Sequence, residues 1–523
     1  MRKNITLVIT ALLIQLIAFS QGTTGAAKTK WGQPVKSTKR NYFSAILGKD
    51  SDNIYAFQKY KSGLYGLGEV KKLEMLSYNK ETMSLKLAND IDLEGRSLES
   101  VKMIGEQVYV FLTETDNKTD VITLQVQEID RKTLTLMPKI YTIGKMNFGN
   151  ASKRKRGFYN IAHSPDNNYI LVNYIHSKDD KYAKQKVDIR VFDTDFDLVW
   201  EKLDNLPFAD EFFSLKEMRV SNDGEVYVLG QVIEEKRDRK NKKQEFQLYA
   251  YKNDGEKIVE YPLVIKDKLI VEMVLAIVGN GDIIVGGFYA NEDYISGTFY
   301  MRINAINQEV AASSFKEFGI DFLVQGLSEK KEKKTKKKAA KGKDVGLYAY
   351  DLRNLKINND GSVVFIAEQS YVVTSTSTDA NGNRITTTTF YDNDIIAVYV
   401  NPQGEIVENI KISKAQIGST SFFHSYVLAI KNNELYFIYN DHIKNLNKTN
   451  NGVESVFRGP KKAVAVVVKV DDSGKIKKSA LFGSKEVGTL MRPKVSVQFE
   501  NNDDVYVVGQ KGKKISLGRI TLK

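Results

Sequence analysis

Four histidines, His163, His176, His424 and His442, are the obvious candidates for metal binding or proton transfer, because the chain of 523 residues has no cysteine. In the repeating unit described below, His163 and His424 differ in register by five residues, roughly 16 Å along a strand at about 3.3 Å per residue. They therefore cannot share a metal ion. Only His424 and His442 can meet, and two histidines without a clear carboxylate partner make a weak site. We predict no metal site, no cofactor and no catalytic histidine.

A run of aspartates, Asp193-Thr194-Asp195-Phe196-Asp197, resembles the start of a calcium loop. It lacks the following glycine and the distal glutamate that such a loop needs, and it falls where the repeat requires a hairpin turn. Turn chemistry explains it. The chain contains no Gly-x-Ser-x-Gly elbow, P-loop or dinucleotide motif. A catalytic carboxylate pair cannot be picked out among 64 acidic residues.

Basic segments are the most prominent charged feature of the chain, whose formal net charge is +13. Residues 329–343 contain nine lysines, and their low complexity predicts a disordered loop. The most basic runs lack interleaved aromatic residues, which argues against nucleic acid as a partner. The candidate residues for binding an anionic partner are Lys153, Arg154, Lys155, Arg156, Lys236, Arg237, Arg239, Lys240, Lys333, Lys334, Lys336, Lys337 and Lys338.

These segments lie between the units of an internal repeat. In each unit a turn rich in glycine, asparagine or aspartate is followed at once by a short apolar run typical of a buried β-strand. The eight runs begin at Ile54, Val108, Tyr169, Val226, Ile283, Val363, Leu435 and Val505.

Each unit contains four antiparallel strands, A to D, with a hairpin turn such as Asn253-Asp254-Gly255 between C and D. The eighth unit stops after its third strand, Ile515–Leu522. A four-stranded unit repeated without helical periodicity resembles a β-propeller, although no named propeller family is matched. We therefore expect an all-β fold, a single propeller of eight four-stranded blades over residues 40–523. Residues 21–39, in particular Lys28 to Lys39, would supply the missing fourth strand of the last blade and close the ring.

In such a ring the A–B and C–D turns share one rim, and the B–C and D–A loops share the other. The first set is short, whereas the second is long and basic, so the second rim is expected to attract anionic partners. Ser370 to Thr389 reads as a long hairpin on that rim with Asn381-Gly382 at its tip. It is either a partner-binding arm or simply an extended hairpin.

The first twenty residues have the pattern of a secretory signal. Arg2 and Lys3 precede the apolar stretch Ile5 to Phe19, and Ala18-Phe19-Ser20 offers small residues for cleavage before Gln21. We expect export to the periplasm, the cell envelope or the medium, without a membrane span after cleavage. An uncleaved anchor is the alternative, but the apolar stretch is short for a span.

Two functions remain open. The first is a non-enzymatic binding or scaffold propeller of a bacterial envelope, whose basic rim docks an anionic polymer or an envelope protein. The second is a carbohydrate-active enzyme, a polysaccharide lyase or a glycosidase, acting on an anionic glycan. An enzyme should gather tyrosine, arginine, glutamate or histidine at one mouth of the ring. No such convergence is visible in the sequence, which favours binding over catalysis and leaves the oligomeric state open.

Overall fold

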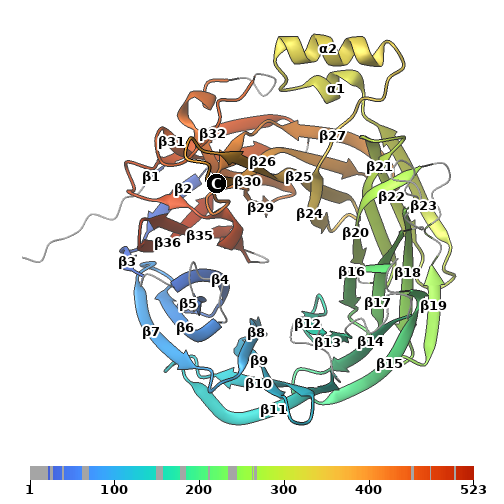
Figure 1. Ribbon diagram of the computed structural model, residues 1–523, viewed down its shortest axis with the longest axis vertical. Coiled ribbons are helices and arrows are strands. Elements are labelled where there is room, and N and C mark those ends of the chain that lie inside the picture. The colour runs from blue at the N-terminus through green and yellow to red at the C-terminus, as the bar shows by residue number, and fades with distance from the viewer. Residues whose placement is uncertain are drawn as a thin grey trace, which may run out of the picture.

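The computed structural model describes residues 22–23, 27–37, 41–61, 70–148, 157–176, 184–209, 213–233, 244–261, 263, 268–278, 280–448, 453–471, 473–499 and 502–523. The predicted signal segment lies outside these residues. Eight antiparallel sheets, the blades, follow one another around a ring, and each starts with its innermost strand (Figure 1).

The strands of blades 1 to 4, each from the innermost strand outward, are β4 (Asn41–Lys49), β5 (Asn53–Lys61), β6 (Val70–Asn79) and β7 (Leu85–Asp92); β8 (Ser97–Ile104), β9 (Gln107–Asp116), β10 (Val121–Ile129) and β11 (Leu136–Asn147); β12 (Phe158–His163), β13 (Ile170–Ile175), β14 (Lys184–Phe192) and β15 (Leu198–Ala209); β16 (Phe213–Val220), β17 (Val226–Ile233), β18 (Gln244–Lys252) and β19 (Lys257–Tyr261).

The strands of blades 5 to 7 are β20 (Leu269–Ile277), β21 (Ile283–Ala290), β22 (Ile295–Ile303) and β23 (Val310–Glu317); β24 (Tyr350–Ile357), β25 (Val363–Thr378), β26 (Arg384–Val400) and β27 (Ile406–Ile412), with β28 (Gln416–Gly418) added beside β26; β29 (Val427–Lys431), β30 (Glu434–His442), β31 (Ala463–Val470) and β32 (Ile476–Gly483). Every second strand begins within one residue of its predicted start, which confirms the eight-bladed repeat.

Blade 8 joins the two ends of the chain. Its inner edge is formed by β33 (Leu490–Met491) and β34 (Val497–Gln498), followed by β35 (Asp504–Lys511) and β36 (Lys514–Leu522). The fourth strand is β2 (Ala27–Trp31), which pairs with β36 from Ala27 opposite Leu522 to Trp31 opposite Gly518. β3 (Val35–Lys36) also pairs with β36, and β1 (Gly22–Thr23) pairs with β2. The predicted closing strand is confirmed.

Apolar side chains fill the spaces between neighbouring blades. β21 is buried along its whole length, as its unbroken apolar sequence predicts. One core cluster combines Tyr227 and Leu248 of blade 4 with Leu275 and Phe299 of blade 5. A single blade cannot cover both of its faces, so the ring is stable only as a closed set.

The segment 329–343 differs from the prediction of a disordered loop. It contains α2 (Glu329–Ala339), which contacts α1 (Ile320–Val324) outside the ring (Figure 1). Glu329 and Glu332 occupy the first turn of α2 and lysines its last turn, which suits the helix dipole. Lys336 Nζ lies 2.9 Å from Glu332 Oε1 and 3.3 Å from Asp321 Oδ1. α2 buries no residue, so its sequence carries no apolar periodicity that could have revealed it.

Two further expectations concern single segments. The hairpin predicted at Ser370 to Thr389 is present, since β25 and β26 pair as far as Thr378 opposite Arg384. The aspartate run forms the turn between β14 and β15, where Asp193 Oδ1 accepts hydrogen bonds from the backbone N–H groups of Asp195 and Asp197 at 3.0 and 2.9 Å. Among the described residues, no helix is long and apolar enough to cross a membrane.

Candidate functional site

Backbone irregularities mark the innermost strands near the rim that carries the B–C and D–A loops. β-Bulges interrupt the pairing of the inner strand in several blades, among them β16 between Leu215 and Glu217 and β24 between Leu352 and Asn354. In β20 the bulge lies immediately before Glu272. Bulges bend a strand and redirect side chains, and they occur often beside active sites.

Two carboxylates lie at the same level on the inner strands of blades 5 and 6. Glu272 pairs with Phe288, the sixth residue of β21, and Asp351 pairs with Glu368, the sixth residue of β25. β20 and β24 are neighbours, with Cα atoms within 8 Å of each other. We call Glu272 and Asp351 the inner carboxylate pair.

The pKa of each member of the inner carboxylate pair is raised. Burial raises the pKa of Glu272, and the charge of Asp351 adds to this effect, whereas Lys216 and Arg353 oppose it. Burial is also the main cause for Asp351, with Arg353 opposing it and Glu368 raising the pKa further. Arg353 Nη2 lies 3.4 Å from Asp351 Oδ2, so a guanidinium stands beside the pair.

A buried ion pair lies next to the inner carboxylate pair, since Glu368 is the residue that pairs with Asp351 across β24 and β25. The side chains of Glu368 and Lys414 are both 0% exposed, and Lys414 Nζ lies 2.9 Å from Glu368 Oε1. Lys414 Nζ also donates to the backbone oxygen of Asp392 and to Gln416 Oε1, at 2.8 and 3.0 Å. The Ser425 hydroxyl donates to Glu368 Oε2 at 2.6 Å. Two charges removed from water persist only when they are paired and supported by hydrogen bonds.

Asp392 connects three blades at this rim. Its Oδ2 lies 3.1 Å from His424 Nδ1 of the segment before β29, and its Oδ1 lies 3.4 Å from Lys494 Nζ of blade 8. Burial would raise the pKa of Asp392, but the hydrogen bond with His424 and the charges of Lys494 and Lys414 hold that pKa well below its usual range. Asp392 is therefore a fixed negative charge.

Aromatic rings flank the cluster. Tyr371 and Tyr391 stack across β25 and β26, with centroids 4.6 Å apart and planes 7° apart. Tyr348, which is 51% exposed, lies beside Tyr371 with 5.6 Å between ring centroids. Nearer blade 8, the Arg492 guanidinium lies 5.2 Å from the centre of the Phe422 ring, and Phe422 is 45% exposed. Exposed rings of this kind offer contact area at low entropic cost.

The hydrogen bonds argue against a serine triad in this cluster. Ser425 donates to Glu368, whereas the Nδ1 atom of the adjacent His424 faces Asp392, so serine, histidine and aspartate are not linked in series. Ser425 has a φ of 70°, an uncommon backbone conformation that its two hydrogen bonds hold in place. Within the described part of the chain, no three histidine or carboxylate side chains are grouped as metal ligands.

The structure separates the predicted anion-binding residues from this cluster. Lys333, Lys334, Lys336, Lys337 and Lys338 lie on α2, outside the ring and away from its inner strands (Figure 1). The other candidates, Lys153, Arg154, Lys155, Arg156, Lys236, Arg237, Arg239 and Lys240, lie outside the described residues.

The residues that do converge were missed from the sequence. Glu272, Asp351 and Arg353 stand in short strands among many other charged residues. The bulges that align them have no sequence marker. His424 does have a carboxylate partner, Asp392, but that residue belongs to the preceding unit of the repeat.

Comparison with known proteins identifies the architecture. No protein-family model and no curated protein sequence matches the chain. Among solved structures, the β-propeller domain of the trilobed protease from Pyrococcus furiosus shares 11% identity at a TM-score of 0.35, covering 85% of this chain and 96% of that one. The dipeptidyl peptidase 4 of Porphyromonas gingivalis shares 10% identity at a TM-score of 0.39, covering 92% of this chain and 59% of that one.

A third solved structure is the α-L-arabinofuranosidase Arb93A from Fusarium graminearum, with 10% identity at a TM-score of 0.31, covering 69% of this chain and 95% of that one. These likenesses concern the fold alone. The prediction of a non-enzymatic scaffold is contradicted, because several of the matched structures are described as a protease domain, peptidases or an arabinofuranosidase. The chain has the architecture of an eight-bladed β-propeller.

Proposed function

We propose that this chain is an exported glycoside hydrolase that cleaves an anionic glycan at the inner carboxylate pair. The observation that carries this proposal is the placement of Glu272 and Asp351, each with a raised pKa, at one level of adjacent inner strands. Glycoside hydrolysis uses two carboxyl groups, one that donates a proton and one that acts as base or nucleophile.

The electrostatics of the pair fit these two roles. The negative charge of Asp351 raises the pKa of Glu272, so the two groups lose their protons in separate steps. Between the two steps one group is protonated and the other is ionised. That is the state in which an acid and a base act together. Glu272 is the group that keeps its proton, so we assign it the role of proton donor, and we assign Asp351, which lies beside Arg353, the role of base or nucleophile.

Cations beside the pair favour an anionic sugar. Arg353 contacts Asp351 directly, and its planar guanidinium suits a carboxylate or sulfate group. Lys494, whose side chain is 40% exposed, contributes a second positive charge from blade 8. The exposed Tyr348 ring on the flank offers a surface for a neighbouring sugar.

Three nearby candidates for a lyase base, Tyr350, Tyr426 and His424, are restrained, whereas Tyr348 and Lys494 are exposed, so the reaction products distinguish hydrolysis from lyase chemistry. A lyase needs an accessible tyrosine, histidine or lysine to remove a carbon-bound proton. Burial raises the pKa of Tyr350 and of Tyr426 well above the ordinary value. His424 is only 3% exposed and is held by Asp392.

Export is part of the proposal. The basic start Arg2-Lys3, the apolar stretch to Phe19 and the small residues Ala18 and Ser20 are the support for it. An exported enzyme would meet glycans of the cell envelope or of the medium.

The test is a depolymerisation assay on polygalacturonate, alginate, hyaluronan and chondroitin sulfate, in which reducing ends and unsaturated uronates are both measured. We expect new reducing ends without unsaturated products, and a bell-shaped dependence of kcat/KM on pH. Asp351→Asn and Glu272→Gln should each lower kcat/KM by at least about 100-fold. Arg353→Ala should mainly raise KM.

Glu309→Gln is the matched control, because Glu309 is an exposed acid in the outer turn between β22 and β23 of blade 5. Its activity should equal that of the wild type. Unsaturated products would establish a lyase and contradict the proposed chemistry. Full activity in both carboxylate variants would show that the inner carboxylate pair is not the catalytic site.

A further inference from the structure

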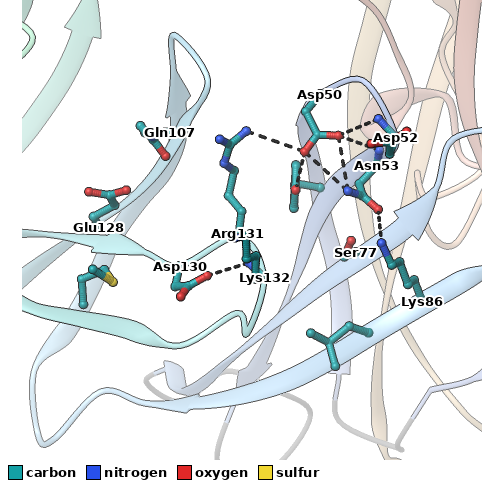
Figure 2. A pocket seen from close by; sticks show the side chains of 13 residues that line it. Asp50, Asp52, Asn53, Ser77, Lys86, Gln107, Glu128, Asp130, Arg131 and Lys132 are labelled. Carbon is teal, nitrogen blue, oxygen red and sulfur yellow. Dashed lines mark hydrogen bonds and ion pairs between the residues drawn. The ribbon is translucent and has the colours of Figure 1, made fainter.

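A cavity lies on the opposite rim of the ring from the inner carboxylate pair, between blades 1 and 2 (Figure 2). Its volume is about 740 Å³, within the range of about 300–1,000 Å³ that is usual for small-molecule sites. The turn from Asp50 to Asn53, which joins β4 to β5, forms one wall. The turn from Asp130 to Lys132, which joins β10 to β11, forms the other.

The cavity exists because a polar bridge replaces close packing at this seam. In blade 4 the corresponding turn places Gly255 against Trp200 of blade 3, so closely that a Cβ atom would lie 2.9 Å from the indole ring. The turn of blade 2 has no glycine. Instead Arg131 reaches across the seam, and its Nη1 lies 3.6 Å from Asp50 Oδ2 (Figure 2). The same atom lies 3.7 Å from Glu106 Oε2 of blade 2.

The blade 1 wall is held in place by Asp50. Its carboxylate accepts hydrogen bonds from the Tyr55 hydroxyl at 2.6 Å and from the backbone N–H groups of Asn53 and Asp52 at 2.7 and 2.9 Å. Burial opposes ionisation, but these hydrogen bonds keep the pKa of Asp50 below its ordinary value. Asp50 is thus a structural anchor that stays negatively charged.

Other polar groups of the cavity are not used by the fold. Ser77 is 4% exposed and lines the cavity, yet its hydroxyl has no hydrogen-bond partner among the described residues. In the same part of the chain, the side chains of Gln107 and Glu128 on the facing wall also have none (Figure 2). Lys86 Nζ makes one hydrogen bond, to Asn53 Oδ1 at 3.1 Å. The hydroxyl of Ser77 can therefore form a hydrogen bond with a molecule in the cavity.

The charges of the lining define the class of ligand. The lining contains four acidic and three basic side chains: Asp50, Asp52, Glu128 and Asp130, and Lys86, Arg131 and Lys132. The pKa values of Asp50 and Asp130 are lowered, so both acids stay ionised and the cavity holds no excess of positive charge that would attract an anion. The unpaired groups of Ser77 and Gln107 can each donate and accept a hydrogen bond, as can a sugar hydroxyl.

We propose that this cavity binds one neutral sugar residue. Ser77, Gln107 and Glu128 would exchange hydrogen bonds with its hydroxyl groups, and Leu87 and Met137 would contact its C–H face. The site is separate from the inner carboxylate pair, and the inference does not depend on the proposed hydrolase function.

The test is saturation-transfer NMR on the full chain with three neutral probes, the methyl glycosides of glucose, galactose and mannose, and one anionic probe, methyl glucuronide. We expect at least one neutral probe to bind and the anionic probe to bind at least about tenfold more weakly. The double variant Gln107→Ala/Glu128→Ala should weaken binding at least about tenfold. Met137→Trp, which narrows the cavity without removing a side-chain hydrogen bond, should also weaken binding.

Glu256→Ala is the matched control on the same rim, because Glu256 is exposed in the turn between β18 and β19 of blade 4 and lines no part of this cavity. It should bind like the wild type. Thermal melts show which variants are folded. The inference is wrong if no neutral probe binds, if the anionic probe binds best, or if folded Met137→Trp binds as the wild type does.

Discussion

Replacing Trp31 should loosen the closure of the ring. Trp31 is 6% exposed and lies opposite Gly518, where a Cβ atom would be 2.6 Å from the indole Cε3 atom. Its ring also meets Phe482 of blade 7 edge-on, with 5.2 Å between centroids. The indole therefore covers the backbone of β36 and ties the last blade to its neighbour.

The magnitude follows from these contacts. A buried tryptophan replaced by alanine typically lowers the free energy of unfolding by about 3–5 kcal/mol, because packing is lost and a cavity remains. Among the described residues the Trp31 indole N–H has no hydrogen-bond partner, so no hydrogen bond is removed. Removing a buried N–H that has no hydrogen-bond partner raises the free energy of unfolding by about 1–3 kcal/mol. For Trp31→Ala we therefore expect a net loss of about 2 kcal/mol.

Phenylalanine provides matched controls. Trp31→Phe keeps a ring over Gly518 and removes the unpaired N–H, so its stability should stay within about 1 kcal/mol of the wild type. Trp200→Phe should lose about 1–3 kcal/mol more than Trp31→Phe, since Trp200 Nε1 donates to the Gly224 backbone oxygen at 3.0 Å. Urea denaturation followed by circular dichroism gives the midpoints. Equal midpoints for Trp31→Ala and Trp31→Phe would refute the reasoning.

Two further predictions concern buried charges. Lys414→Met should lower the free energy of unfolding by about 3–5 kcal/mol, because it leaves Glu368 charged and buried. The double variant Lys414→Met/Glu368→Gln should recover part of this loss. Equal urea midpoints for the single and double variants would contradict this prediction. Burial raises the pKa of Glu454 from 4.5 to about 7; the charge of Lys478 opposes this shift and the charge of Asp441 reinforces it. The folded state therefore favours the protonated acid, so the free energy of unfolding should fall as the pH rises from about 4.5 to about 7. Glu454→Gln should therefore raise the melting temperature relative to the wild type at about pH 8 but not at about pH 5, and a difference independent of pH would speak against this assignment.

The repeat made the architecture predictable because its signals are local. The turn before Val226 and the apolar run after it identify a strand without knowledge of any other part of the chain. The closing strand could also be predicted, since the eighth unit lacked one strand and the N-terminal segment was unassigned. α2 could not be predicted, because its stability comes from charged contacts such as Lys336 with Asp321 rather than from an apolar face.

The candidate site could not be read from the sequence for a different reason. Glu272 and Asp351 are 79 positions apart in the numbering and meet only because successive blades rotate about a common axis. Asp392 and Lys494 are joined in the same way across blade 7. Such contacts depend on the curvature of the ring and on β-bulges, and no particular type of residue marks either feature in the sequence.

The pairing of β2 with β36 also determines when the protein can finish folding. Ala27 is among the first described residues to be synthesised and Leu522 among the last, so β2 must wait for almost the whole chain before its partner exists. Contacts between such distant positions form slowly, because a large loop must close first. A chain cut short before β36 keeps seven blades and leaves β2 unpaired. Moving residues 27–31 by circular permutation to follow Leu522 would turn this late encounter into a local hairpin and should speed refolding.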